Sequence, residues 1–213
     1  PIGLPFGYFP NQTKRSSGVI IPSYGEEKQR GFYLSQGGYY LALSDYVDLT
    51  FLGEIYTSGS WGLTMRSNYR KRYKYNGSLD LVYNSVINGD KELKSVPGGY
   101  SKSNTYSIKI NYTRDSKAIP NASFNTAVNF RSSNYSQYNA SNQNYGSNNT
   151  ERFENNTSSS IAYTKSWPGT PFNFSANMSA NQNLTSHKVS LELPTLALNM
   201  TTQHPFRKIN NSP

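Results

Sequence analysis

Apolar and polar residues alternate along most of this chain with a period of two, and the spacing typical of amphipathic helices is nearly absent. In residues 47–56 the odd positions are apolar or glycine, and the even positions are mostly polar. The same alternation recurs in residues 106–113, 122–131 and 172–181. Because successive side chains of a β-strand point to opposite faces, each segment would have one apolar and one polar face. The pattern predicts an all-β chain.

Several of the predicted strands are long. They approach the roughly 9–11 residues of a tilted membrane strand, whereas strands of soluble proteins typically have about five or six. The ten predicted strands lie near 17–23, 31–43, 46–56, 62–73, 78–86, 104–113, 122–132, 159–167, 171–182 and 188–201.

The predicted connections tend to alternate between short and longer ones. The short ones are 44–45, 74–77, 115–120 and 168–170, and the longer ones are 24–30, 57–61, 86–103, 133–158 and 183–187. Outer-membrane barrels alternate in this way, with tight periplasmic turns and longer extracellular loops. Aromatic residues near strand ends would form the interfacial girdles; they are Tyr39, Tyr40, Tyr46, Tyr56, Trp61, Tyr73, Tyr75 and Trp167. We therefore predict an antiparallel transmembrane β-barrel fragment, roughly ten strands of a larger barrel.

The alternation slips by one residue at two places. Apolar residues change from even to odd positions across Gly37-Gly38, and from odd to even positions across Pro194. One extra residue in a strand sends every later side chain to the other face, so we predict a β-bulge at both places.

Composition excludes several protein classes. The 213 residues include no cysteine, which excludes disulfide scaffolds, cysteine-ligated metal sites and thiol enzymes. No apolar run reaches the roughly 20 residues of a membrane-spanning helix. Only 15% of the residues are charged, although the formal net charge is +9.

The sequence contains no pattern typical of catalysis. His187 and His204 lie in separate loop-like segments without neighbouring carboxylates, and neither a nucleophile motif nor a phosphate-binding loop is present. We expect no enzymatic activity, no catalytic residue, no metal site and no cofactor.

Basic residues gather at 14–15, 28–30 and 70–72, near loops and strand ends. They do not form the single stripe with stacking aromatics that nucleic-acid binding would favour, so we expect no nucleic-acid partner. In a barrel they would suit an anionic lipid with phosphate groups, or they would be a solvated charged rim.

Pro22 closes the apolar segment 18–22, which is otherwise typical of a strand. Proline has no N–H for a β-ladder and is tolerated at sheet edges or strand ends. Pro22 therefore either ends this strand or weakens its pairing where the sheet must open.

Residues 5–22 resemble the start of the barrel in the LptD family of lipopolysaccharide-assembly outer-membrane proteins. The shared pattern is a proline-rich entry, the basic pair Lys14-Arg15, Ser17-Gly18 and an apolar strand that ends in Pro22. The segments 31–34 and 39–40 resemble the family's second strand, and the Asn- and Tyr-rich style resembles its Bacteroidetes branch. The specific resemblance covers roughly residues 5–83.

The resemblance implies lipopolysaccharide transport in the bacterial outer membrane, with lateral release of the lipid through a weakened seam between the first and last barrel strands. Prolines in the first two strands weaken that seam in the family. Pro22 matches the first such position, whereas Ser35 stands at the second and Gly37-Gly38 would loosen the strand instead. The implied seam residues are Val19, Ile21, Pro22, Ser35, Gly37 and Gly38.

The resemblance also implies a domain division and a set of partners. Residues 1–16 would be a periplasmic entry segment, and residues 17–213 the first part of the barrel, with the last strand of the seam beyond Pro213. The implied partners are lipopolysaccharide, the outer-membrane bilayer, an LptE-like plug lipoprotein and a periplasmic LptA-like bridge. Two other readings stay open: a porin or nutrient transporter, and a surface β-sandwich that binds glycans.

Overall fold

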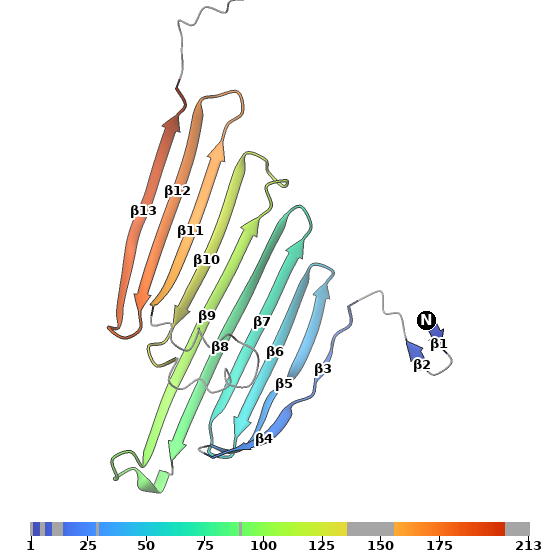
Figure 1. Cartoon of the computed structure of the whole chain (residues 1–213), viewed down its shortest axis with the longest axis vertical. Helices are drawn as coiled ribbons and strands as arrows, with labels where there is room; N and C mark the ends of the chain where they lie inside the picture. Colours follow the sequence, from blue (N-terminus) through green and yellow to red (C-terminus); the bar gives the residue numbers. More distant parts are fainter. Residues whose placement is uncertain are drawn as a thin grey trace, which may run out of the picture.

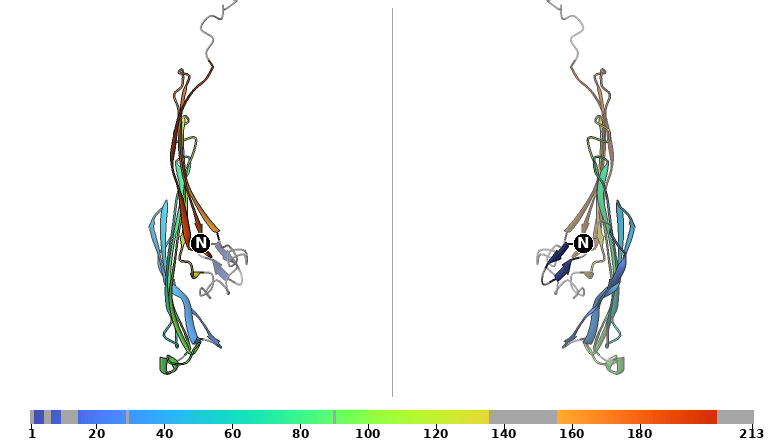
Figure 2. Two further views of the ribbon diagram at one scale, coloured as in Figure 1. Left: turned by 90° about the vertical axis from the view of Figure 1, so that its left-hand side faces the viewer. Right: turned by 90° about the vertical axis from the view of Figure 1, so that its right-hand side faces the viewer.

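The computed structural model describes the backbone of residues 2–4, 7–9, 15–28, 30–89, 91–135 and 156–202, and the side chains of these ranges from Arg15 onward. The described chain is one antiparallel sheet of eleven strands, together with a separate two-stranded sheet of β1 (Ile2–Leu4) and β2 (Gly7–Phe9) (Figure 1). Seen edge-on, the large sheet is a single twisted layer (Figure 2).

From β5 to β13, strands that follow one another in sequence are neighbours in the sheet, so the topology is up-and-down, and β3 and β4 both pair with β5. The sheet is not closed: β3 and β4 form one edge and β13 forms the other. The strands are β3 (Gly18–Ile20), β4 (Ser23–Glu27), β5 (Gly31–Ser44), β6 (Val47–Tyr56), β7 (Trp61–Lys71), β8 (Tyr75–Gly89), β9 (Tyr100–Arg114), β10 (Ala122–Arg131), β11 (Asn156–Ser166), β12 (Phe172–Asn183) and β13 (Lys188–Met200). A single 3-10 turn, η1 (Lys91–Leu93), lies between β8 and β9.

The prediction of an antiparallel barrel fragment is confirmed at the level of fold class, and each predicted strand has a counterpart. From β5 to β13 every strand has at least ten residues, as a tilted membrane strand requires. No helix in the described part of the chain is long and apolar enough to cross a membrane.

Two predicted loops were too long. Residues 24–27 belong to β4 rather than to a loop, because they pair with residues 31–34 of β5 and only 28–30 connect the two strands. Likewise β8 and β9 continue to the pair Gly89↔Tyr100, so the predicted loop 86–103 shrinks to residues 90–99. Backbone pairing extends both hairpins beyond the point where the apolar alternation fades. Most of the predicted loop 133–158 lies outside the described residues, but β11 already begins at Asn156.

The alternation separates the two faces of the sheet. The cross-strand pairs Ile55↔Trp61, Phe51↔Met65 and Leu79↔Ile110 place apolar side chains on one face, which stays exposed at Phe51, Leu63 and Leu198. The other face is polar and includes the Arg66–Asp80 ion pair at 3.4 Å. An exposed apolar face this extensive is typical of a surface that meets a membrane or a partner.

Aromatic rings line the apolar face near both strand ends. At the end with short turns, successive ring contacts with centroids 5.6–6.5 Å apart link Tyr69, Tyr75, Tyr112, Phe124, Tyr163 and Phe174. Towards the other end lie the pairs Trp61–Tyr83 and Tyr106–Phe130. Two such rows match the aromatic girdles of outer-membrane barrels, although only Trp61 and Tyr75 of the predicted girdle residues belong to them.

Candidate functional site at the first sheet edge

The first edge of the sheet is one hairpin with an interruption in its outer strand. β3 pairs with β5 as far as Ile20↔Gly38, and β4 resumes the pairing at Ser23↔Ser35. Ile21 and Pro22 make no ladder pair and stand opposite Gln36 and Gly37. Two residues face two residues, so the ladder resumes in its original register.

Pro22 and Gly37 together explain the interruption. Proline cannot donate to the ladder, and its ring covers the backbone of the neighbouring strand: a Cβ atom on Gly37 would lie 2.7 Å from Cβ of Pro22. Gln36 beside it has a positive φ of 60°, which is uncommon for a residue with a side chain. The break in the outer strand therefore lies beside an irregular point of β5.

A β-bulge lies at the same level on the other side of β5. Ser35 and Gln36 together stand opposite Glu54, between the pairs Leu34↔Ile55 and Gly37↔Gly53. The bulge brings the β6 backbone so close that a Cβ atom on Gly38 would overlap the carbonyl oxygen of Phe51. The bulge predicted from the slip at Gly37-Gly38 is confirmed.

The second predicted bulge is also confirmed. In β13 the residues Leu193 and Pro194 together stand opposite Met178, between the pairs Asn177↔Thr195 and Ser179↔Glu192.

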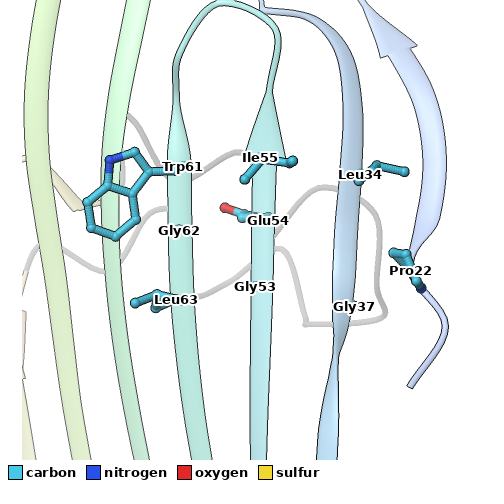
Figure 3. A pocket seen from close by; sticks show the side chains of 9 residues that line it. All are labelled: Pro22, Leu34, Gly37, Gly53, Glu54, Ile55, Trp61, Gly62 and Leu63. Carbon is cyan, nitrogen blue, oxygen red and sulfur yellow. The ribbon is translucent and has the colours of Figure 1, made fainter. Parts of the chain in front are cut away.

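An apolar groove of about 400 Å³ lies beside the break on the apolar face. In Figure 3 the glycines leave bare ribbon on β5, β6 and β7, between Pro22 on one side and Trp61 and Leu63 on the other. The residues that line this groove, which we call the glycine groove, are Pro22, Leu34, Gly37, Gly53, Glu54, Ile55, Trp61, Gly62 and Leu63. A second hollow of about 690 Å³ shares Leu34 and Ile55 with it and extends past Tyr24 and Phe32.

Polar contacts hold the two ends of the edge hairpin. At one end Arg15 donates to the carboxylate of Asp48 at 3.2 Å, and the same carboxylate accepts the backbone N–H of Asn68 at 3.0 Å. At the other end Arg30 donates to Glu27 at 2.7 Å and lies 3.8 Å from the ring centre of Tyr56. The interruption at Pro22 thus lies between two anchored ends.

The structure brings the six predicted seam residues together. Val19 and Ile21 are 75% and 86% exposed at this edge. Pro22 covers Gly37, Gly38 lies against β6, and Ser35 is buried and pairs with Ser23. The sequence analysis did not identify Leu63 and Trp61, which form walls of the glycine groove. The groove could have been suspected from Gly53, a glycine at an apolar position of an otherwise regular strand.

The basic clusters lie at different places. Arg15 and Arg30 belong to the ion pairs above, whereas residues 70–72 lie at the short-turn end, with Lys71 Nζ 4.5 Å from the ring centre of Tyr46. Lys14 and Gln29 lie outside the described residues, as does His204. His187 lies in the turn between β12 and β13, and no group of three or more potential metal ligands occurs among the described residues.

A family model described as LptD protein matches residues 1–212. The chain belongs to the LptD family. It is therefore an outer-membrane protein of lipopolysaccharide transport and assembly, rather than a porin, a nutrient transporter or a surface β-sandwich that binds glycans. LptD proteins are transport proteins rather than enzymes, and they act on lipopolysaccharide in the outer membrane. The open eleven-stranded sheet is consistent with part of an LptD barrel. No curated protein matches the chain.

Proposed function

We propose that β3 and β4 form one side of a lateral exit through which this LptD-family protein releases lipopolysaccharide into the outer membrane. The observation that carries the proposal is the interruption at Ile21 and Pro22, which stand opposite Gln36 and Gly37 without ladder pairs. The lipid would leave between this edge and the last strand of the barrel.

The physical basis is the high cost of an open sheet edge in lipid. Unpaired backbone groups cost several kcal/mol each in the hydrocarbon core, so a barrel normally stays closed. A seam that opens must depend on few ladder bonds. The outer strand at this edge is divided into segments of three and five residues, whereas β8 and β9 pair continuously over 15 residues each.

The two faces of the sheet suit the two parts of the cargo. The apolar face with Leu49 and Phe51 would meet acyl chains, and the polar face with Asp48 and Thr50 would border the lumen through which the sugar chain passes. Residues 1–16 would lead from the periplasm into the barrel formed by residues 17–213. An LptE-like plug in the lumen and an LptA-like periplasmic bridge would complete the pathway.

Photo-cross-linking in living cells tests the lateral exit. A photoreactive amino acid replaces Val19 or Ile21 in the full-length protein, and adducts with pulse-labelled, newly made lipopolysaccharide are measured. Leu196 is the control. It is an exposed residue of β13, at the opposite edge of the described sheet, and its distance from the short-turn end is similar to that of Val19 and Ile21.

We expect early adducts at Val19 and Ile21, before labelled lipid reaches Leu196 from the surrounding bilayer. Adducts that appear at all three positions at the same time would contradict a lateral exit at this edge. The pulse label matters because resident lipopolysaccharide of the outer leaflet can reach any residue that faces the membrane.

A further inference from the structure

We propose that the glycine groove holds one acyl chain of lipopolysaccharide as the lipid leaves the seam. This inference rests on the proposed lateral exit. It identifies the glycine groove as the place where the emerging lipid first binds the membrane-facing surface of the barrel. The groove continues the membrane-facing surface of the barrel, and Pro22 of the interrupted edge is one of its walls.

The groove is a local gap between large apolar side chains of this face. Gly37 and Gly53 are cross-strand partners, and neither contributes a side chain. Their neighbours on the same face are the large pairs Tyr39↔Phe51 and Leu34↔Ile55. Because Pro22 covers Gly37, the uncovered floor between the apolar walls is the backbone at Gly53.

Close packing does not require glycine at position 53. A Cβ atom there would have as its nearest neighbours the carbonyl oxygen of Gly37 at 3.8 Å and Cδ2 of Leu63 at 4.0 Å, which are ordinary contacts. Gly38 differs, because its Cβ atom would overlap the backbone of Phe51. The space above Gly53 is thus free for a ligand.

The lining favours an alkyl chain over a headgroup. The walls are Leu34, Ile55, Trp61 and Leu63, and the one charged residue, Glu54, belongs to the opposite face. Its carboxylate lies across Gly62, where a Cβ atom would be 2.7 Å from Oε1 of Glu54. Burial of apolar surface is the main attraction that such a site can offer.

The shape also suits a linear chain. The second hollow shares Leu34 and Ile55 with the groove and continues along β4 and β5 past Phe32 and Tyr24. Together the two hollows extend along the strand direction from the break in the edge, and Glu26 is the one charged residue that lines the second hollow.

The test combines a substitution that fills the groove with photo-cross-linking that detects the bound lipid. Gly53→Leu places a side chain on the floor of the groove, and Ala176→Leu adds a similar group to the same face in β12 as a matched control. A photoreactive amino acid at Leu63 reports on the groove, and one at Ile161 reports on the distant membrane-facing surface. Adducts with pulse-labelled lipopolysaccharide and with phospholipid are measured in the full-length protein.

We expect an early lipopolysaccharide adduct at Leu63 and none at Ile161. Gly53→Leu should reduce the Leu63 adduct by about fivefold, whereas Ala176→Leu should leave it unchanged. Heat-modifiable electrophoretic mobility checks that each variant forms a folded barrel, and Gly53→Val serves as the smaller filling variant if Gly53→Leu does not assemble.

Two results would contradict the binding of an acyl chain in the glycine groove. One is a Leu63 adduct formed only with phospholipid, and the other is a lipopolysaccharide adduct that survives filling of the groove. If Val19 still reacts early with lipopolysaccharide in those experiments, the lateral exit stands and only the groove is wrong. If Val19 does not react early in the otherwise unchanged protein, the proposed exit itself is wrong.

Discussion

Both edges of the described sheet carry a proline at an irregularity, yet the two edges are built differently. At the first edge Pro22 divides the outer strand into β3 and β4, and the ladder resumes in the same register. At the last edge β13 runs through Pro194 as one strand of 13 residues, and its register shifts by one residue.

The partner strand explains the difference. Opposite Pro194, the two residues Leu193 and Pro194 face the single residue Met178, so the extra residue forms a bulge and pairing continues on both sides. Opposite Pro22 the strand offers two residues for two, and the proline ring packs on Gly37. A proline is therefore absorbed where the pairing has an extra residue, and it interrupts the ladder where it has none.

The largest effect is expected from Gly38→Val, which adds a side chain where β5 approaches β6 beside the bulge. Its Cβ atom would overlap the backbone oxygen of Phe51, and backbone cannot move aside as a flexible side chain can. We expect a loss of more than about 3 kcal/mol in the free energy of unfolding, seen as loss of the heat-modifiable barrel in the full-length protein. Gly53→Ala is the control, with an expected change below about 1 kcal/mol. Normal assembly of Gly38→Val would show that this close approach is not required.

The second prediction compares the two prolines directly. Pro22→Val restores a backbone N–H at the first edge and removes the ring from Gly37, so the seam should pair more tightly and lipopolysaccharide export should fall by about fivefold. Pro194→Val should leave export unchanged, because β13 is already paired on both sides of its bulge. Surface lipopolysaccharide is measured at equal barrel levels, and equal export in the two variants would remove the gating role of Pro22.

A smaller effect is expected at the anchor of the first edge. Asp48→Ala removes the acceptor of the Asn68 backbone N–H and of Arg15, which should cost about 1–3 kcal/mol in urea unfolding. Arg15→Gln should cost less than about 1 kcal/mol, because the Arg15 side chain is 55% exposed and its ion pair is screened by solvent. Equal losses in the two variants would mean that the ion pair, rather than the Asn68 hydrogen bond, holds this end.

The smallest effect is expected at the last edge. Glu192 accepts a hydrogen bond from the hydroxyl of Ser179 across β12 and β13, but Glu192 itself is exposed. Glu192→Gln keeps an acceptor oxygen and should leave the unfolding midpoint unchanged within the precision of the measurement. A clear shift of that midpoint would indicate that the last edge depends on side-chain anchoring as the first edge does.

Much of the architecture could be predicted because it depends on local patterns. Period-two alternation identified the strands, and each parity slip located a bulge without any knowledge of the partner strand. Predicted boundaries failed where polar residues continue a hairpin, as in residues 24–27, because backbone pairing needs no apolar side chain.

What required the tertiary structure is the relation between residues far apart in the sequence. The parity slip already marks Pro194 as the site of a bulge, whereas only the pairing with β5 shows that Pro22 interrupts the ladder and packs on Gly37. Gly53 forms the floor of a groove only because Gly37 is its partner and Pro22 stands beside Gly37. Alternation along a strand reports which face a side chain occupies, but register and cross-strand neighbours arise only when the strands pair.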